Sequence, residues 1–145
     1  MSKTKYREVL SRYLNREITL HCSDFKLIKG DNEKLLLLLK RPAVMRIGGI
    51  GRKGNWVFEH LWVSIPDEVA EYIEKYFPLI RKLSIYGRVY KYHYKDSGNP
   101  QVGVRATKIS ILKYNKNIAK KYNLRPGQLL STDRMDSILK KEGFI

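Results

Sequence analysis

The sequence has one cysteine, few acidic residues and no long apolar run. Cys22 is the only cysteine among 145 residues, so no internal disulfide can form and a zinc site built on several thiolates is excluded. The longest apolar run, residues 35–39, is far shorter than the ~20 residues that a membrane-spanning helix needs. Residues 1–7 lead into no apolar segment typical of a secretory signal. These absences predict a cytoplasmic protein with no membrane partner.

Positive charge is what the sequence has in excess. It holds 29 Lys and Arg against 14 Asp and Glu, a formal net charge of +15 at pH 7. The excess is spread along the chain, with 13 basic against 6 acidic residues in 1–64, 8 against 5 in 65–112 and 8 against 3 in 113–145. A domain this cationic attracts polyanions, so nucleic acid, an anionic membrane and an acidic protein are the candidate partners. Solubility alone needs far less charge, although a hot-environment composition stays open.

Periodic apolar residues predict a succession of strands with helices before, between and after them. The hydrophobic content of 43% can supply a core, and the length fits one domain. Strands are expected over residues 16–28, 34–47, 56–65, 82–94 and 101–112. Helices are expected over residues 3–14, 66–77, 115–122 and 131–142.

The order strand–strand–strand–helix–strand–strand is that of the five-stranded Greek-key barrel called the OB-fold. Residues 16–112 therefore resemble the OB-fold superfamily by element order. The expected fold is mainly β with flanking helices (α+β), and the resemblance implies an OB-like five-stranded barrel over 16–112. The helical periodicity adds two parts outside the plain OB-fold pattern, an amphipathic N-terminal helix (1–15) packed on the barrel and a basic helical C-terminal appendage (113–145). The superfamily commonly binds single-stranded nucleic acid or oligosaccharide, which carries over as an expectation. A split barrel or another small β-barrel is the alternative.

Two of the expected strands carry aromatic side chains at every second position. Since side chains alternate across a strand, each row should point away from the core, opposite an aliphatic row that faces it. The row on strand 56–65 comprises Trp56, Phe58, His60 and Trp62. The row on strand 82–94 comprises Tyr86, Arg88, Tyr90, Tyr92 and Tyr94, with Lys91 nearby. Exposed rings can stack on bases for about 1–3 kcal/mol each, whereas the alternative is that tyrosine is simply a good strand former.

Glycines and cations cluster between strands 34–47 and 56–65. We expect residues 46–54 to form a flexible loop whose amides, with Arg46, Arg52 and Lys53, suit phosphate oxygens. The segment is not a phosphate-binding loop of the Walker type, since no Gly-Lys-Ser/Thr ends it, nor a dinucleotide fingerprint, since a strand follows it. An ordinary long hairpin connection is the alternative.

No constellation predicts catalysis. His21, His60 and His93 lie on three different expected strands, and their spacing is not typical of a metal site. The acidic residues are scattered, with no pair that would indicate a nuclease or a glycosidase. We therefore expect no enzymatic activity, no metal and no other cofactor.

The leading hypothesis is a non-catalytic protein that binds single-stranded DNA or RNA through stacking and Lys/Arg–phosphate contacts. One alternative is a duplex-DNA-binding regulator using a helix-turn-helix-like segment at 117–129, with the barrel serving dimerisation. Another is a protein-interaction or inhibitor module with an acidic partner. A dimer is possible, and the sequence does not decide between DNA and RNA. The residues predicted to contact nucleic acid are Arg46, Arg52, Lys53, Trp56, Phe58, Trp62, Tyr86, Arg88, Tyr90, Lys91 and Tyr92.

Overall fold

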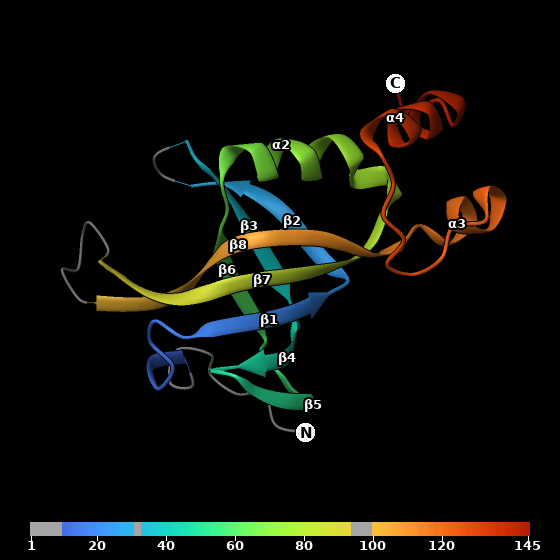
Figure 1. Ribbon diagram of the computed structural model, residues 1–145. Helices are drawn as coiled ribbons and strands as arrows, with labels where there is room; N and C mark the ends of the chain where they lie inside the picture. Colours follow the sequence, from blue (N-terminus) through green and yellow to red (C-terminus); the bar gives the residue numbers. More distant parts are fainter. Residues whose placement is uncertain (1–9, 31–32, 94–99) are drawn as a thin grey trace.

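The computed structural model describes residues 10–30, 33–93 and 100–145 (Figure 1), and for 50–57, 92–93 and 100–101 it describes the backbone alone. The strands are β1 (Glu17–Cys22), β2 (Asp24–Lys29), β3 (Leu35–Lys40), β4 (Ala43–Ile47), β5 (Ile50–Val57), β6 (His60–Ser64), β7 (Ile80–His93) and β8 (Pro100–Tyr114). The helices are α2 (Asp67–Tyr76), α3 (Lys116–Tyr122) and α4 (Thr132–Lys141), with a 3-10 turn at Phe77–Leu79.

The strands form one sheet in the order β2-β3-β6-β8-β7-β1-β4-β5. Ser23 alone separates β1 from β2, so these are two halves of one bent strand. Its β2 half pairs with β3 at one end of the order, and its β1 half pairs with β7 and β4 near the other end. β3 with β4, and β5 with β6, are likewise halves of the second and third long strands. The pairings are antiparallel except for β6 with β8, which are parallel. The five long strands thus pair as 1-2-3-5-4-1, which confirms the expected OB-like order.

Alternation of buried and exposed side chains places the core inside this curved sheet. Ile18, Leu20 and Cys22 of β1 are buried, while Glu17 is exposed. α2 contributes Ala70, Ile73 and Tyr76 to the same core. Each fully buried Leu or Ile adds about 1.5–3 kcal/mol through removal of its apolar surface from water.

α2 begins and ends where the sequence predicts. Pro66 precedes its first residue with an extended backbone, and acidic residues occupy the first turn, where the helix dipole favours negative charge. Phe77 and Pro78 end it in a 3-10 turn.

The three expected N-terminal strands are broken at Ser23, at Arg41–Pro42 and at Phe58–Glu59. The last two breaks face each other, because the Arg41 amide donates to the Glu59 carbonyl at 3.0 Å and the Phe58 amide donates to the Pro42 carbonyl at 3.3 Å. Irregularities of this kind let a sheet turn the corner that a barrel requires.

The expected flexible loop over residues 46–54 is wrong. β4 and β5 form a hairpin in which Ile47 pairs with Ile50, and only Gly48 and Gly49 lie between them. Both glycines have positive φ, +61° and +83°, as a tight two-residue hairpin turn requires. Arg52 and Lys53 therefore lie within a strand.

The expected N-terminal helix falls mostly outside the described residues. Leu10 and Ser11 are helical, and residues 12–15 are a turn, so the helix ends earlier than expected. Leu10 is fully buried, and the Asn15 amide donates to the Val89 carbonyl of β7 at 2.8 Å.

The C-terminal helices continue from β8 and pack on the domain. Asn115 caps α3 and Ser131 caps α4 through side-chain oxygens that accept from backbone amides of the first turn. Met135, Ile138 and Leu139 of α4 belong to the same buried core as the barrel. In the part of the chain that the structure describes, no helix is both long and apolar enough to cross a membrane.

α4 is anchored to α2 by a polar contact as well. The Tyr76 hydroxyl donates to Asp136 Oδ1 at 2.6 Å, and Lys75 Nζ lies 3.0 Å from the same oxygen. These contacts hold the pKa of Asp136 below its usual value, first through the hydrogen bond from Tyr76 and then through Lys75. The appendage is thus fixed to the barrel rather than tethered to it.

Candidate nucleic-acid interface

An exposed tyrosine stands at the centre of a row of side chains that crosses four strands. Tyr86 of β7 pairs with Thr19 of β1 on one side and with Lys108 of β8 on the other, and Thr19 pairs in turn with Arg46 of β4. Directly paired residues of neighbouring strands share one face of a sheet. The side chain of Tyr86 is 41% exposed, and Lys108 Nζ lies 6.0 Å from its ring centroid. The row therefore presents an accessible ring with a cation beside it.

A β-bulge sets the position of Lys108 in this row. Tyr86 pairs with Lys108, but Gly87 pairs with Ala106, so Thr107 is an extra residue in β8. The Thr107 hydroxyl donates to the Tyr86 carbonyl at 3.2 Å. A Cβ on Gly87 would lie only 2.6 Å from the Arg105 carbonyl oxygen, so only glycine permits this approach of the two strands.

The next rung of the β7–β8 ribbon opposes two arginines. Arg88 pairs with Arg105, and directly opposed like charges destabilise a strand pair. Glu17 of β1 lies 3.9 Å from Arg88, but both side chains are well exposed, so the pair contributes about 0–1 kcal/mol. A shallow groove of about 270 Å³ runs between this rung and the Tyr86 row.

The rung beyond the arginines connects the two predicted aromatic rows. Tyr90 pairs with Gly103 of β8, and the Arg105 guanidinium lies 4.7 Å from the Tyr90 ring centroid. Val63 and Ser64 of β6 pair with residues 104 and 105, so Trp62 and Gly103 are the preceding positions of that parallel pair. Continuing that register by one position would set Trp62 beside Gly103, on the side of Gly103 opposite Tyr90.

Trp62 also lines a larger groove on the outer side of β2, β3 and β6. Its volume is about 640 Å³, and its walls carry charges of both signs. The other residues that line it are Asp24, Leu38, Lys40, Arg41, Glu59 and His60. The groove places the half-buried Trp62 ring near two cations. It lies beside β3 and β6, which belong to the second and third long strands, and OB-folds use the face of these two long strands for oligonucleotides and oligosaccharides.

The predicted outward position of Phe58 is wrong. Phe58 is fully buried in the core. It lies in the break between β5 and β6, where the alternation of side chains is interrupted, so its ring points inward while Trp62 still points outward. Phe58 cannot stack on a base.

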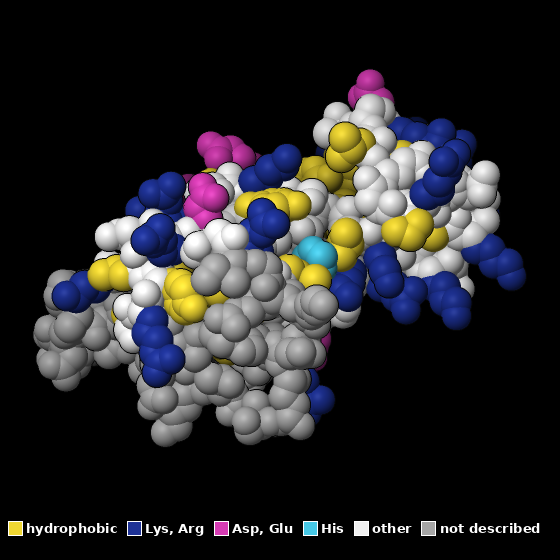
Figure 2. Space-filling model, turned by 60° about the horizontal axis from the view of Figure 1, so that its bottom comes forward, with side chains coloured by type: hydrophobic (Ala, Val, Ile, Leu, Met, Phe, Trp, Pro, Cys, Tyr) yellow, Lys and Arg dark blue, Asp and Glu magenta, His cyan; other side chains and the backbone are white. Residues whose placement is uncertain are grey.

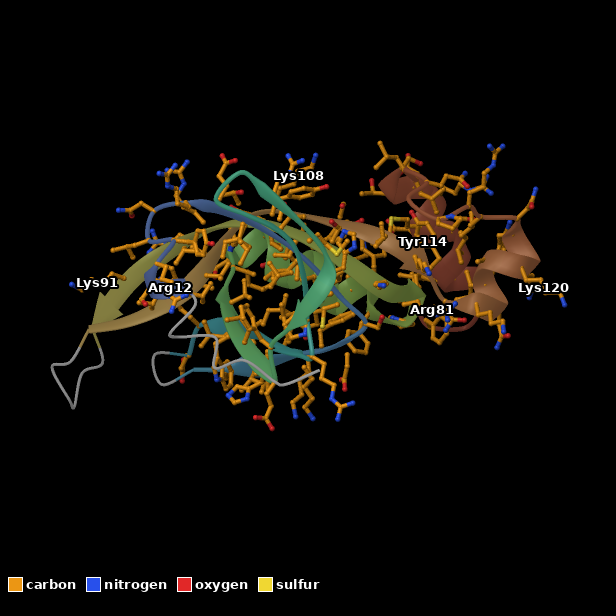
Figure 3. The ribbon with its side chains drawn as sticks, turned by 90° about the horizontal axis from the view of Figure 1, so that it is seen from below. Arg12, Arg81, Lys91, Lys108, Tyr114 and Lys120 are labelled. Atoms are coloured by element: carbon orange, nitrogen blue, oxygen red, sulfur yellow. The ribbon has the colours of Figure 1, made fainter. Side chains whose placement is uncertain are left out.

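The remaining predicted residues divide into two groups. Lys91 is exposed near the end of the β7–β8 hairpin (Figure 3) and pairs with Val102. Because side chains alternate along β7, Lys91 does not belong to the set of paired side chains formed by Tyr86, Arg88 and Tyr90 with their partners on β8. The side chains of Arg52, Lys53, Trp56 and Tyr92 lie outside the described residues, so their contacts stay predictions.

Lys108, Arg105 and Thr19 were missed by the sequence reasoning. Each is an ordinary strand residue, and its place beside Tyr86 or Tyr90 follows only from the register between strands. The alternation of β8 could have identified Arg105 as outward-facing, but the bulge at Thr107 reverses that alternation before Lys108.

No group of three or more His, Cys, Asp or Glu side chains suited to a metal ion occurs among the described residues. His21 is half-buried on β1, and its pKa is lowered by burial and then by the nearby Lys82. Burial raises the pKa of the Cys22 thiol. Both groups are therefore neutral at pH 7.

Comparison with known proteins gives distant similarities in structure, among them two to single-stranded DNA-binding proteins. No protein-family model matches this sequence, and no curated protein matches it. A small single-stranded DNA-binding protein from Mycoplasma pneumoniae is 19% identical, with a TM-score of 0.46 over 67% of this chain and 92% of that chain. A mitochondrial single-stranded DNA-binding protein from S. cerevisiae is 13% identical, with a TM-score of 0.39 over 69% of this chain and 95% of that chain.

Proposed function

We propose that this protein binds single-stranded nucleic acid, without catalysis, along the outer face of β7 and β8. The observation that carries the proposal is the row Lys108–Tyr86–Thr19–Arg46, in which an accessible ring lies between cations. Base–aromatic stacking contributes about 1–3 kcal/mol per base and accepts any base, and the cations neutralise the phosphates on either side.

The neighbouring rungs extend this platform. Arg88 and Arg105 oppose each other, and among the described residues only Arg88 has a carboxylate within ion-pair distance, so a phosphate between the two arginines would relieve their repulsion. Tyr90 and Trp62 offer two further rings in the direction of the 640 Å³ groove.

The distribution of charge favours the same face. α2 carries four exposed acidic residues, Asp67, Glu68, Glu71 and Glu74. It lies beyond β8, on the side away from β1 and β4 (Figure 1). A polyanion is therefore repelled from the α2 side and attracted to the outer face of the β1–β7–β8 sheet.

A single strand fits this face better than a duplex. Stacking needs an unpaired base whose face is accessible, which a duplex does not offer. The helix-turn-helix alternative requires a turn of about 3–4 residues, whereas residues 123–131 separate α3 from α4.

Titration of fluorescently labelled single-stranded DNA and RNA tests the proposal. Tyr86→Ala should weaken binding by about 5- to 150-fold, the equivalent of one lost stacking contact, whereas Tyr86→Phe, which keeps the ring, should bind like the wild type. Phe77→Ala is the matched control, because Phe77 is 46% exposed but lies at the end of α2. Equal affinity of Tyr86→Ala and Phe77→Ala for both nucleic acids would rule out the Tyr86 platform.

A further inference from the structure

The ladder of paired side chains on β7 and β8 does not stop at Tyr86. Ser84 pairs with Ser110, and Lys82 pairs with Lys113. At about 3.3 Å per residue, these rungs extend the ladder by roughly 13 Å from Tyr86 toward α3. Lys113 lies only three positions before Lys116, the first residue of α3.

The rung of Ser84 and Ser110 forms a strip of short polar side chains between two rungs that carry lysines. His21 of β1 pairs with Ser84, so the strip spans three strands. The Ser84 Oγ is buried and has no hydrogen-bond partner within the described part of the chain. An unpaired buried hydroxyl costs about 1–3 kcal/mol, and a phosphate oxygen above the strip would accept a hydrogen bond from it after a small side-chain movement.

The rung of Lys82 and Lys113 opposes two positive charges. Neither lysine has a carboxylate within ion-pair distance among the described residues. Directly opposed like charges destabilise a strand pair, so this rung is costly unless an anion lies across it. The lowered pKa of His21, caused by burial and then by Lys82, agrees with a positive potential over the strip.

α3 prolongs the ladder on a fixed support. The Gly127 amide donates to the Leu112 carbonyl of β8 at 2.7 Å, and Lys121 Nζ lies 3.1 Å from Glu142 Oε2. Lys116 and Lys120 are one turn apart and exposed, opposite the buried Ile118. Figure 3 shows Lys91, Lys108 and Lys120 spaced along the length of the molecule, and Figure 2 shows Lys and Arg gathered at the end that carries α3 and α4.

We infer that a single strand held at Tyr86 continues over the serine strip, crosses Lys82 and Lys113, and ends on Lys116 and Lys120 of α3. The C-terminal helical appendage is then the second half of one elongated site. This inference rests on the proposed function, and it adds the direction of the strand and the role of α3.

Oligonucleotides of two lengths distinguish binding at the barrel platform from binding at α3. An oligonucleotide of about 5 nucleotides reaches only the barrel platform, whereas one of about 15 nucleotides reaches α3 as well, both within the range that OB-folds occupy. The full-length Lys116→Gln/Lys120→Gln variant should bind the short strand like the wild type and the long strand more weakly. Loss of two phosphate contacts lowers the salt slope of the long strand by about 1.4 in log–log units, so between 50 and 200 mM salt the wild type should lose about sevenfold more affinity than the variant.

Lys140→Gln/Lys141→Gln is the matched control. It removes the same charge from α4, which docks on α2, and both lysines are exposed. This variant should keep the wild-type slope with both strands. An α3 variant that behaves like the α4 control, or that weakens the short and the long strand equally, overturns the inference and leaves the proposed function intact. A wild-type protein that binds neither strand overturns both.

Discussion

Gly87 is the residue where the fold and the proposed interface depend most directly on each other. A Cβ at this position would lie 2.6 Å from the Arg105 carbonyl oxygen and 3.0 Å from Val104 Cγ1. Carbon–oxygen contacts between strands are ordinarily about 3.3 Å or longer, so Gly87→Ala must separate β7 and β8 by roughly 0.7 Å. Backbone cannot rotate away as a side chain would, and forced overpacking of this kind costs about 1–3 kcal/mol.

Two measurements follow from this clash. For a chain of this length, the cost corresponds to a fall in Tm of roughly 2–12 °C, measured by circular dichroism. The strand shift also moves Lys108 away from the Tyr86 ring, which it now approaches to 6.0 Å, so single-strand affinity should fall while the variant is still folded.

Gly143→Asn is the control for Gly87→Ala. Gly143 has φ +78°, open space around its Cα and a position just after α4, and asparagine tolerates such a backbone. It should leave affinity unchanged and lower Tm by less than Gly87→Ala does. A Gly87→Ala protein whose Tm stays within about 1 °C of the wild type would refute the close approach of the two strands and the bulge built on it.

Two further predictions concern the core and the pH dependence of stability. Phe58→Ala should lower the free energy of unfolding in urea by about 3–5 kcal/mol, the usual cost of truncating a buried phenylalanine, and should leave single-strand affinity unchanged where the protein is folded; a selective loss of affinity would contradict its buried position. The pKa of His21 is lowered in the folded state, first by burial and then by Lys82, so the unfolded chain binds the proton more readily and the free energy of unfolding should fall as the pH drops below about 6.5. His21→Gln should flatten that pH dependence, and a variant with the wild-type pH profile would contradict the prediction.

The order of elements could be read from the sequence because it depends on local signals. Pro66 and two acids begin α2, Pro78 ends it, and side-chain caps begin α3 and α4. β7 and β8 could be found from alternation along each strand. These signals act over a few residues, and they determined the fold class through the order of the elements.

The breaks in the N-terminal strands could not be read in the same way. Arg41 adopts φ +51° without being a glycine, and its amide bonds to Glu59, 18 positions along the chain. The conformation at Phe58 depends likewise on the carbonyl of Pro42. Because each break is stabilised by the other, neither has a local signature, and the alternation around Phe58 was extrapolated across a point where it fails.

The break that buries Phe58 is also what leaves Trp62 available to the proposed interface. Had alternation run unbroken through residues 58–62, an inward Phe58 would have drawn Trp62 inward as well, since both occupy even positions of the same strand. Instead Glu59 and His60 are both exposed, the alternation restarts in β6, and the half-buried Trp62 lies one position before the residues of β6 that pair with β8. Parallel pairing of β6 with β8 then brings it within two strands of Tyr90, about 10 Å at the usual strand spacing. Trp62 and Tyr90 are therefore brought to two strands apart by a pairing that the OB-like order imposes, and removing either ring should shorten the same proposed platform rather than abolish a separate one.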